Sequence, residues 1–383
     1  MRRQHILKLI SPLQSLQWLV LTIFTWLAPL AAQGLTFEFD YSLDSSGFFS
    51  GGLGPIKRAA LEAAAKVWGN LITDEIGAIN PIGGRGYYDL YGIHPETGEV
   101  ERLDRNPSIP GNTLRVYVAS QPMDAQTLAK GGPGGYAWAP SGRNRSPIIA
   151  NISRGESGIT RPGSTRELDL KQDFAPWGGV ISFNSEYQDF HWNHRLKVPA
   201  DKIDFYATCL HELGHVLGIG TSETWEQQVS GNAFQGPHAV QAYHLAGGNG
   251  DIPLIGDLSH WSYSVKSFDL LGNRKYTPLM FASATDGVRG QITQLDAMVL
   301  KDIGWDIIQI NGIQAEPVSL SVTRQSGRIT LSFESETGRT YELLTSINMR
   351  DWTVTKQRTG NGSTLEWILD TNGSQAFWKV QAR

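Results

Sequence analysis

The sequence is poor in cysteine and carries no excess of positive charge. Beyond the N-terminal segment it has no long apolar run. Cys209 is the only cysteine among 383 residues, so no disulfide can form within the chain. The formal net charge is -4 at pH 7, and without a basic stripe to meet a phosphate backbone we expect no nucleic-acid partner. The fold must therefore be stabilised by its hydrophobic core, and a bound metal ion is a candidate for further support.

Length and composition place the chain among ordinary globular proteins. Apolar residues make up 40% and charged residues 18% of the sequence, within the range of globular domains. The 42 glycines and 18 prolines indicate many loops. A chain of this length can form one large domain and a second, smaller one.

The first 34 residues are predicted to be an export signal. Arg2, Arg3 and Lys8 precede the apolar run LQWLVLTIFTWLAPL, and AAQG follows with the small residues that a signal peptidase prefers. The alternative is an uncleaved membrane anchor, but the run is shorter than a comfortable span. We expect cleavage near Ala32 or Gly34, no stable membrane span afterwards, and a secreted protein, extracellular or periplasmic.

Residues 35–311 are predicted to form an α+β domain. Runs of alternating apolar and polar residues predict three strands, at 35–43, 112–120 and 178–185. Apolar residues at helical spacing predict three helices, at 56–72, 201–218 and 292–307, the last of them stopping near Gly304. Between the last two helices we expect a long loop that reaches about residue 277.

The composition changes after about residue 312. Short alternating runs separated by SG, TG and NG pairs fill residues 316–383, which predicts a small all-β, sandwich-like domain. The pattern of Tyr341, Trp352, Phe377 and Trp378 resembles the small β modules of many secreted bacterial proteins. The module has no evident catalytic cluster, and a surface or a glycan is its candidate partner.

The stretch HELGH, residues 211–215, is a zinc-binding signature. His211 and His215 lie one helical turn apart and can direct both imidazoles at one point. Glu212 is the next residue along the helix, where a general base can take a proton from an activated water. An accidental string on a surface helix is the alternative, but the apolar flanks favour burial, and unpartnered buried histidines are costly.

The residues after HELGH extend the motif. Gly218 can adopt a positive φ, end the helix and turn the chain back under the metal. The resulting pattern, HExxHxxG, resembles the metzincin clan of zinc endopeptidases. Most metzincins place a third histidine three residues after this glycine. This chain has Thr221 there, and a neutral hydroxyl is a poor zinc ligand.

The third ligand is expected from an insertion, because the chain resembles the leishmanolysin-like branch more closely. In that branch an insertion separates the glycine from the third histidine. His260 stands in GDLSHWSYS, with 44 residues between it and His215, and the resemblance favours it as the ligand. His238 and His244 remain the alternatives, because a catalytic zinc usually has three protein ligands and a water. His260 could also be a surface histidine beside a packing tryptophan.

The resemblance, which spans about residues 35–308, also covers the end of the domain. TPLMFASATDG, residues 277–287, is similar to the metzincin methionine turn, which precedes the final helix. Met280 is then expected to form an apolar floor beneath the zinc site. Some metzincins have a metal-binding tyrosine two residues later. Ala282 stands there, so no tyrosine ligand is expected.

Three further features could in principle bind metal: a histidine pair, the single cysteine and an acidic stretch. His191 and His194 are expected to be an incidental pair, because no carboxylate or thiolate lies nearby at ligand spacing. Cys209 is expected to be a buried, inert thiol, so the propeptide-cysteine latency of many metzincins is not expected. The Asp- and Gly-rich residues 247–258 are a candidate calcium site, although they lack the spacing of a recognised calcium loop.

The resemblance implies a secreted zinc endopeptidase in which Glu212 is the general base and a protein or peptide is the substrate. In metzincins the peptide binds along an edge strand above the zinc helix, and residues 178–185 are the candidate strand. The alternatives are a catalytically inactive binding protein that has kept the fold and a structural zinc site. Retention of Glu212 favours the enzyme, and structural zinc sites usually use cysteines.

Overall fold

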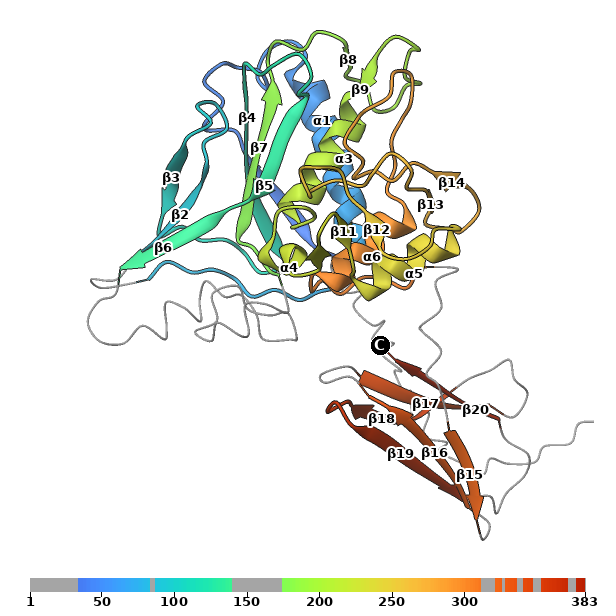
Figure 1. Cartoon of the computed structure of the whole chain (residues 1–383). Coiled ribbons are helices and arrows are strands. Elements are labelled where there is room, and N and C mark those ends of the chain that lie inside the picture. The colour runs from blue at the N-terminus through green and yellow to red at the C-terminus, as the bar shows by residue number, and fades with distance from the viewer. Residues whose placement is uncertain are drawn as a thin grey trace, which may run out of the picture. The chain divides into compact units, whose positions relative to one another are not determined.

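The computed structural model describes residues 34–82, 87–139, 174–310, 321–325, 328–335, 340–346, 353–370 and 377–382. The predicted export signal and the junction between the two predicted domains lie outside these residues. The architecture is α+β, as predicted (Figure 1). No helix within the described ranges is long and apolar enough to cross a membrane.

A mixed four-stranded sheet forms the centre of the large domain. Its strands are β1 (Thr36–Asp40), β4 (Thr113–Gln121), β7 (Gly178–Asn184) and β5 (Ala129–Pro133), in that order across the sheet. The first three run parallel, and β5 is antiparallel to β7. Every residue of β7 is buried, because side chains of an internal strand are covered on both faces.

The two faces of this sheet are covered differently. Val116, Val118 and Ile181 belong to the main hydrophobic core, whereas the alternate residues Tyr117 and Val180 belong to a second cluster. This is the two-residue period of a strand. The second cluster lies under a small antiparallel sheet of β2 (Tyr87–Ile93), β3 (Val100–Arg105) and β6 (Gly135–Ala139).

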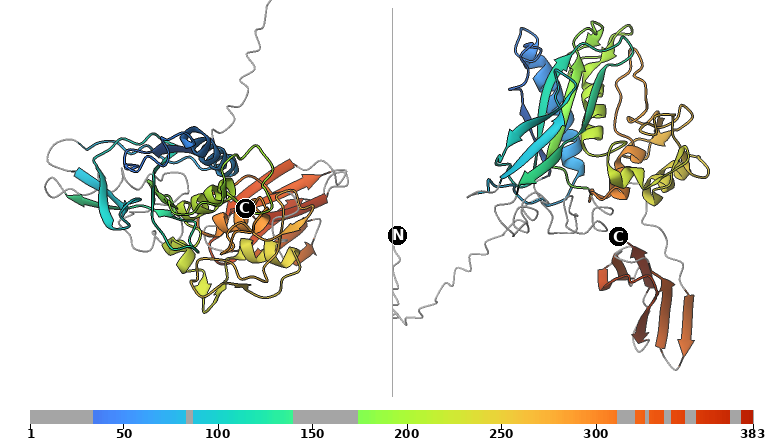
Figure 2. Two further views of the ribbon diagram at one scale, coloured as in Figure 1. Left: turned by 90° about the horizontal axis from the view of Figure 1, so that it is seen from above. Right: turned by 60° about the vertical axis from the view of Figure 1, so that its left-hand side comes forward.

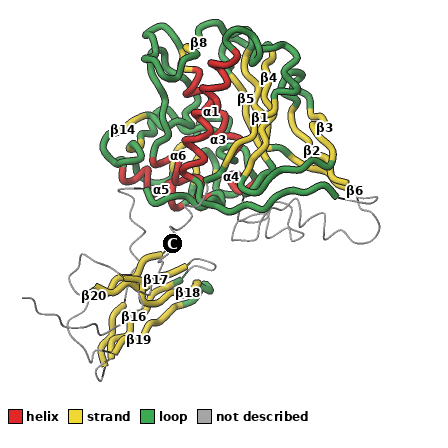
Figure 3. Tube along the Cα trace, turned by 180° about the vertical axis from the view of Figure 1, so that it is seen from behind, coloured by secondary structure: helices red, strands yellow, loops and turns green. Residues whose placement is uncertain are grey.

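Helices cover the other face. They are α1 (Gly54–Leu71), α3 (Phe205–Val216) and α6 (Gln294–Asp302), and all three contribute to the main core. Seen from behind, these helices gather on one side and the strands on the other (Figure 3). Figures 1 and 2 show the small sheet on the opposite side from the helices. The predicted helix 56–72 is confirmed, and the predicted helix 292–307 is shorter, with Gly304 at φ +113° just beyond its end.

The segment predicted to be a long loop before residue 277 contains regular structure. It holds two helices, α4 (Glu223–Glu226) and α5 (Pro237–Leu245), and five short strands: β10 (Val229–Ser230), β11 (Ala233–Phe234), β12 (Ile252–Pro253), β13 (Ser267–Phe268) and β14 (Lys275–Tyr276). Trp225, Phe234 and Trp261 pack together inside it, with centroids 4.4 to 5.7 Å apart. Burial of these rings stabilises the insertion as a small structural unit.

The described residues from Ser321 onward form two three-stranded antiparallel sheets. One contains β15 (Ser321–Gln325), β16 (Arg328–Glu334) and β19 (Thr364–Asp370), and the other β18 (Thr353–Thr359), β17 (Thr340–Ser346) and β20 (Phe377–Ala382). The two sheets share one hydrophobic cluster. Phe333 of β16 and Tyr341 of β17 pack with ring centroids 4.9 Å apart.

Candidate metal centre

Helix α3 carries the His-Glu-x-x-His stretch. It begins at Phe205 rather than near residue 201, because Ile203 and Asp204 form the short strand β9 and pair with β8 (Phe190–His191). The helix ends at Val216, and Gly218 follows with φ of +99°. This conformation suits glycine and was expected at this position.

Three histidine rings converge on one point. The Nε2 atoms of His211, His215 and His260 lie 3.1 Å from one another in all three pairs. In the described part of the chain this is the one group of three or more His, Cys, Asp or Glu side chains that could hold a metal ion. The structure therefore brings His260, of the three downstream candidates, to the pair on α3.

The tautomer of each ring follows from the partner of its other nitrogen. His211 Nδ1 lies 2.9 Å from the carbonyl oxygen of Leu279, and His215 Nδ1 lies 2.7 Å from that of Ile219. A carbonyl oxygen can only accept, so each Nδ1 carries the proton and donates. The corresponding Nε2 atoms are then unprotonated and present lone pairs to the centre.

The third ring is held in the same way by a carboxylate. His260 Nδ1 donates to Asp257 Oδ2 over 2.7 Å. Burial acts to raise the pKa of Asp257, but the hydrogen bonds from Ser259 and His260 lower it below its ordinary value. The carboxylate is thus ionised at neutral pH and fixes His260 in the tautomer that binds metal.

This donor set fits a zinc ion. Three unprotonated nitrogens that face one another cannot form hydrogen bonds with one another, and a cation between them satisfies all three lone pairs. Tetrahedral zinc with bonds of about 2.0–2.1 Å separates two nitrogens by about 3.3 Å, close to the observed 3.1 Å. Three protein ligands leave a fourth position open, as catalytic zinc requires.

The electrostatics of the two helical ligands agree with this assignment. Burial, and next the neighbouring His260, lower the pKa of His211 to about 4. Burial and the two other rings lower the pKa of His215 well below its ordinary value. Both imidazoles are therefore neutral across the physiological pH range, so no proton competes with a metal ion there.

The segment that ends in His260 contacts the turn after α3. Ser259 Oγ donates to the carbonyl oxygen of Gly220 over 2.7 Å. Thr221 donates its hydroxyl to the carbonyl oxygen of His215 over 2.7 Å. Thr221 is thus bonded to the backbone and lies outside the histidine group, while Ser259, next to His260 in the sequence, ties this segment to the turn.

Glu212 lies beside the triad and against strand β5. Its side chain is buried, with 5% of the residue exposed. Burial raises the pKa of Glu212 to about 8, and the backbone amide of Gly131 acts in the opposite direction. A Cβ on Gly131 would lie 2.6 Å from the carbonyl oxygen of Glu212, so the absence of a side chain lets β5 approach the helix this closely.

The prediction that residues 178–185 form the edge strand is wrong. Strand β7 occupies this stretch, but it is internal, and β5 lies at the edge. Strand β5 has the sequence AKGGP, although glycine- and proline-rich stretches more often form loops. Its pairing with β7 and its contact with α3 are long-range interactions that local composition does not encode.

An open cavity of about 1080 Å³ runs along this edge and over the histidines. It is bordered by β5 and the residues before it, by α3, and by the loop between Tyr276 and Gln291. Thr208, Glu212 and His260 are among the side chains that line it. A cavity of this size, with polar groups gathered at one point, is typical of a ligand-binding cleft.

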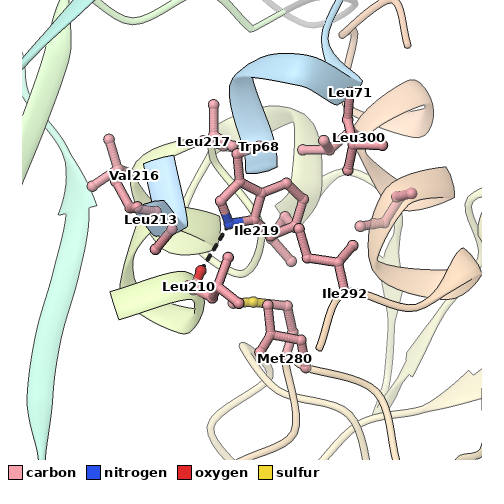
Figure 4. Packing of buried hydrophobic residues seen from close by; sticks show 14 of the residues in the cluster. Trp68, Leu71, Leu210, Leu213, Val216, Leu217, Ile219, Met280, Ile292 and Leu300 are labelled. Carbon is pink, nitrogen blue, oxygen red and sulfur yellow. Dashed lines mark hydrogen bonds between the residues drawn. The ribbon is translucent and has the colours of Figure 1, made fainter. Parts of the chain in front are cut away.

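Met280 lies beneath the site and is fully buried. Its sulfur lies 2.5 Å from the position that a Cβ on Gly214 would take, between the two helical ligands in the sequence. Trp68 supports the same helix from α1 and donates its indole N–H to the carbonyl oxygen of Leu210 over 2.9 Å (Figure 4). The methionine thus forms an apolar floor and contributes no ligand.

The other candidate histidines have different roles. His238 is the second residue of α5, where its backbone N–H donates to Asp302, and His244 Nε2 lies 2.7 Å from the carbonyl oxygen of Gly250. His191 Nε2 is buried without a hydrogen-bond partner, and the ring of His194 stacks on Tyr206. None of the four belongs to a metal-ligand group among the described residues.

Two further expectations concern the thiol and the acidic stretch. Cys209 is fully buried, and burial raises the pKa of its thiol well above the ordinary value, so it is inert as expected. In residues 247–258 the two carboxylates are engaged separately, Asp251 by Gln235 and Asp257 by His260. Neither belongs to a group of three or more His, Cys, Asp or Glu side chains that could hold a metal ion in the described residues.

Comparison of the chain with protein-family models, curated proteins and solved structures gives no match. Three features of the site were not predicted from the sequence: the edge strand β5, the carboxylate that orients His260, and Asp296 of α6. The carboxylate could have been predicted, because Asp257 stands three residues before the candidate ligand His260.

Proposed function

We propose that this chain is a secreted zinc endopeptidase of the metzincin type, similar to the leishmanolysin-like branch. The observation that carries the proposal is the convergence of three unprotonated histidine nitrogens, 3.1 Å apart, beside the buried carboxyl of Glu212. The order along the chain supports it: an edge strand, a helix with two ligands, a third ligand, a buried methionine and a final helix.

Zinc is the proposed ion because three neutral imidazoles with one open position match its catalytic sites. Each ligand ring is fixed by a second hydrogen bond to a carbonyl or carboxylate oxygen. Such bonds set the tautomer and make the ring a better ligand. Bound zinc would supply a Lewis acid for the scissile carbonyl and for the attacking water.

Glu212 would move the protons of the reaction. Its position next to His211 places the carboxyl at the border of the ligand group and the cavity. A carboxyl whose pKa is raised toward neutrality can accept a proton from water and return it to the leaving amine. No other acidic side chain that lines the cavity is directly adjacent in sequence to one of the ligands on α3.

The peptide would bind along β5 as an additional strand. Among the described residues β5 is the last strand of its sheet and lies beside Glu212, so a peptide could pair with its outer edge by β-strand addition. Main-chain hydrogen bonds would then hold the substrate in an extended conformation. This arrangement predicts cleavage of extended or unfolded protein segments.

The test is a pair of measurements on the mature chain, wild type and variants. The first is the zinc content after dialysis against a weak chelator, for the wild type and His260→Ala. The second is hydrolysis of an unfolded protein substrate by the wild type and by Glu212→Gln, which keeps all three ligands. We expect one zinc ion in the wild type, loss of most of it in His260→Ala, and zinc without hydrolysis in Glu212→Gln.

Three outcomes would contradict the proposal. A wild type that binds no metal ion would remove the zinc site and with it the enzyme. A Glu212→Gln variant as active as the wild type would exclude the assigned general base. A wild type that binds zinc but hydrolyses no peptide would instead favour a binding protein that has kept the fold.

A further inference from the structure

Asp296 is a buried carboxylate on the final helix, outside the ligand group. It is the third residue of α6 and is completely shielded from solvent. It accepts two hydrogen bonds at the start of its own helix, from the backbone N–H of Thr293 over 2.9 Å and from its hydroxyl over 2.7 Å. These two bonds form an ordinary capping arrangement and explain an acidic residue here.

Three further donors reach the same carboxylate from other parts of the chain. Leu279 N–H donates to Oδ2 over 2.8 Å, and Met280 N–H donates to Oδ1 over 3.0 Å. The indole N–H of Trp261 donates to Oδ1 over 3.3 Å. Helix capping does not require any of these, so they need a separate explanation.

Each of the three donors is one or two covalent or hydrogen-bonded steps from a candidate ligand. Trp261 directly follows the ligand His260. The carbonyl oxygen of Leu279 accepts the Nδ1 proton of His211. Met280 lies under α3, and its carbonyl oxygen accepts the backbone N–H of Trp261 over 3.1 Å. The carboxylate of Asp296 thus joins the end of the insertion to the methionine turn.

We propose that Asp296 is a positioning residue that, through Trp261 and Met280, docks the insertion so that His260 reaches the metal position. This inference rests on the proposed metal site and goes beyond it. His211 and His215 are held by one helix, but His260 belongs to a separate segment of chain. Its position depends on contacts that fix the insertion to the rest of the domain.

The hydrogen-bond pattern suits two acceptor oxygens rather than an amide. Five donors from the described residues face the two oxygens of Asp296. Burial raises the pKa of Asp296 above its ordinary value, and the hydrogen bonds from Met280, Thr293 and Leu279 act in the opposite direction. An asparagine would have to turn its NH₂ group toward N–H donors on one side or the other.

The two carboxylate oxygens accept different numbers of hydrogen bonds, and this difference predicts which bonds Asp296→Asn would lose. Oδ2 receives three donors and Oδ1 two, so the amide oxygen should take the place of Oδ2 and keep the helix cap. The NH₂ group would then oppose the N–H groups of Met280 and Trp261. The variant should therefore release the link to the insertion while α6 stays capped.

The test measures zinc release in variants that break this link at different points. Asp296→Asn weakens the junction at the carboxylate, and Trp261→Phe removes the indole N–H together with part of a fully buried ring, so its cost in packing is followed by the thermal unfolding measurement. Thr293→Ala is the matched control, because it removes one hydrogen bond of the same carboxylate without touching the insertion. Transfer of zinc to a chromophoric chelator gives the dissociation rate, and thermal unfolding of the metal-free protein gives the change in stability.

We expect zinc to leave Asp296→Asn and Trp261→Phe about tenfold faster or more. Thr293→Ala should change the rate by less than about twofold, even if it lowers the melting temperature. In a His260→Ala background, Trp261→Phe should have no further effect on zinc binding beyond about twofold. The effect would then pass through His260, and this coupling distinguishes positioning from a general loss of stability.

The opposite results would overturn the inference. If Trp261→Phe weakens zinc binding equally with and without His260, its effect does not pass through the third ligand. If it leaves the release rate unchanged in the otherwise wild-type chain, the indole link is not needed, even where Asp296→Asn fails to fold. A wild type that binds no zinc would contradict the proposed function itself. This result is distinguishable from the two Trp261→Phe results, which concern only the positioning role.

Discussion

The carbonyl oxygen of Ser259 fills the space that a Cβ on Gly220 would require. The hydroxyl of Ser259 also donates to the carbonyl oxygen of Gly220 over 2.7 Å. The turn after α3 and the end of the insertion are therefore in direct backbone contact. Through this contact the segment that carries His260 is fixed to the turn that follows the two helical histidines.

Gly220→Ala should weaken metal binding by more than its cost in stability explains. Gly220 has φ of +75°, so an alanine there costs about 1–2 kcal/mol in backbone strain alone. The Cβ would also push Ser259 away and move His260 from the other two rings. We expect a lower zinc affinity, measured by competition with a chromophoric chelator, together with a lower melting temperature.

Gly250→Ala is the matched control for this variant. Gly250 also lies in the insertion with φ of +68°, and no atom lies within 4 Å of the Cβ it would gain. The two variants share the backbone strain, and only Gly220→Ala displaces Ser259. Equal zinc affinities in the two would show that the Ser259 contact does not position His260.

Gly131→Ala should lower peptidase activity while zinc stays bound. A Cβ at this position would lie 2.6 Å from the carbonyl oxygen of Glu212 and 3.0 Å from its Cβ. Strand β5 must then move away from the general base, and displacements of this order reduce rates by up to about a hundredfold. The measurement is kcat/KM on an unfolded protein substrate, with the zinc content determined in parallel.

The neighbouring glycine provides the comparison. A Cβ on Gly132 would meet no atom within 4 Å, so Gly132→Ala should retain activity close to that of the wild type. The two substitutions are chemically identical and lie on the same strand. A similar loss of activity in both variants would mean that the cause is a stiffer strand or a clash with the substrate. The separation between β5 and Glu212 would then not explain it.

Asp257→Asn should reduce zinc affinity by about tenfold to a hundredfold. The substitution keeps the size of the side chain but removes the negative charge that His260 Nδ1 faces over 2.7 Å. The control is Asp251→Asn in the same insertion, because Asp251 accepts a hydrogen bond from Gln235 and none from a ligand. Zinc affinities that fall equally in both variants would exclude a specific role for Asp257.

Features encoded within a few residues were predictable from the sequence. The pair His211 and His215 needs only helical spacing, and helix α1 needs only its apolar face. The turn at Gly218 follows from the conformational freedom of glycine. The position of His260 needed more than spacing, because three histidines follow the motif and only the family resemblance favoured this one.

Features set by distant partners were not predictable. The start of α3 at Phe205 depends on the pairing of Ile203 with Phe190 of β8. The edge position of β5 depends on which strands pair, and its glycines carry no strand propensity. Asp296 was not distinguished by its sequence, since its role depends on donors at Trp261, Leu279 and Met280 that only the folded chain brings together.

A last prediction concerns the pH dependence of stability, outside the metal site. Asp74 is 3% exposed, its Oδ2 accepts the backbone N–H of Asp306, and its Oδ1 is buried without a hydrogen-bond partner. Burial, and next the charge of Asp306, raise the pKa of Asp74 from its ordinary value of 3.8 to about 8. Between these values the folded chain holds a proton that the unfolded chain has released.

This difference makes the fold less stable as the pH rises from about 4 to about 8. One extra proton on the folded state corresponds to a loss of at most about 1.4 kcal/mol per pH unit. Asp74→Asn cannot ionise, so its free energy of unfolding should fall less steeply over this range and exceed that of the wild type near pH 8. Denaturant unfolding of the metal-free chains at several pH values gives both slopes.

Asp306→Asn separates the two causes of the shift. It removes the neighbouring charge but leaves the burial of Asp74 unchanged, so the pKa of Asp74 should stay raised, though less than in the wild type. The gain in stability near pH 8 should then be smaller than that of Asp74→Asn. Parallel pH profiles for the wild type and Asp74→Asn would mean that Asp74 titrates alike in both states, because only a difference in bound protons changes the slope.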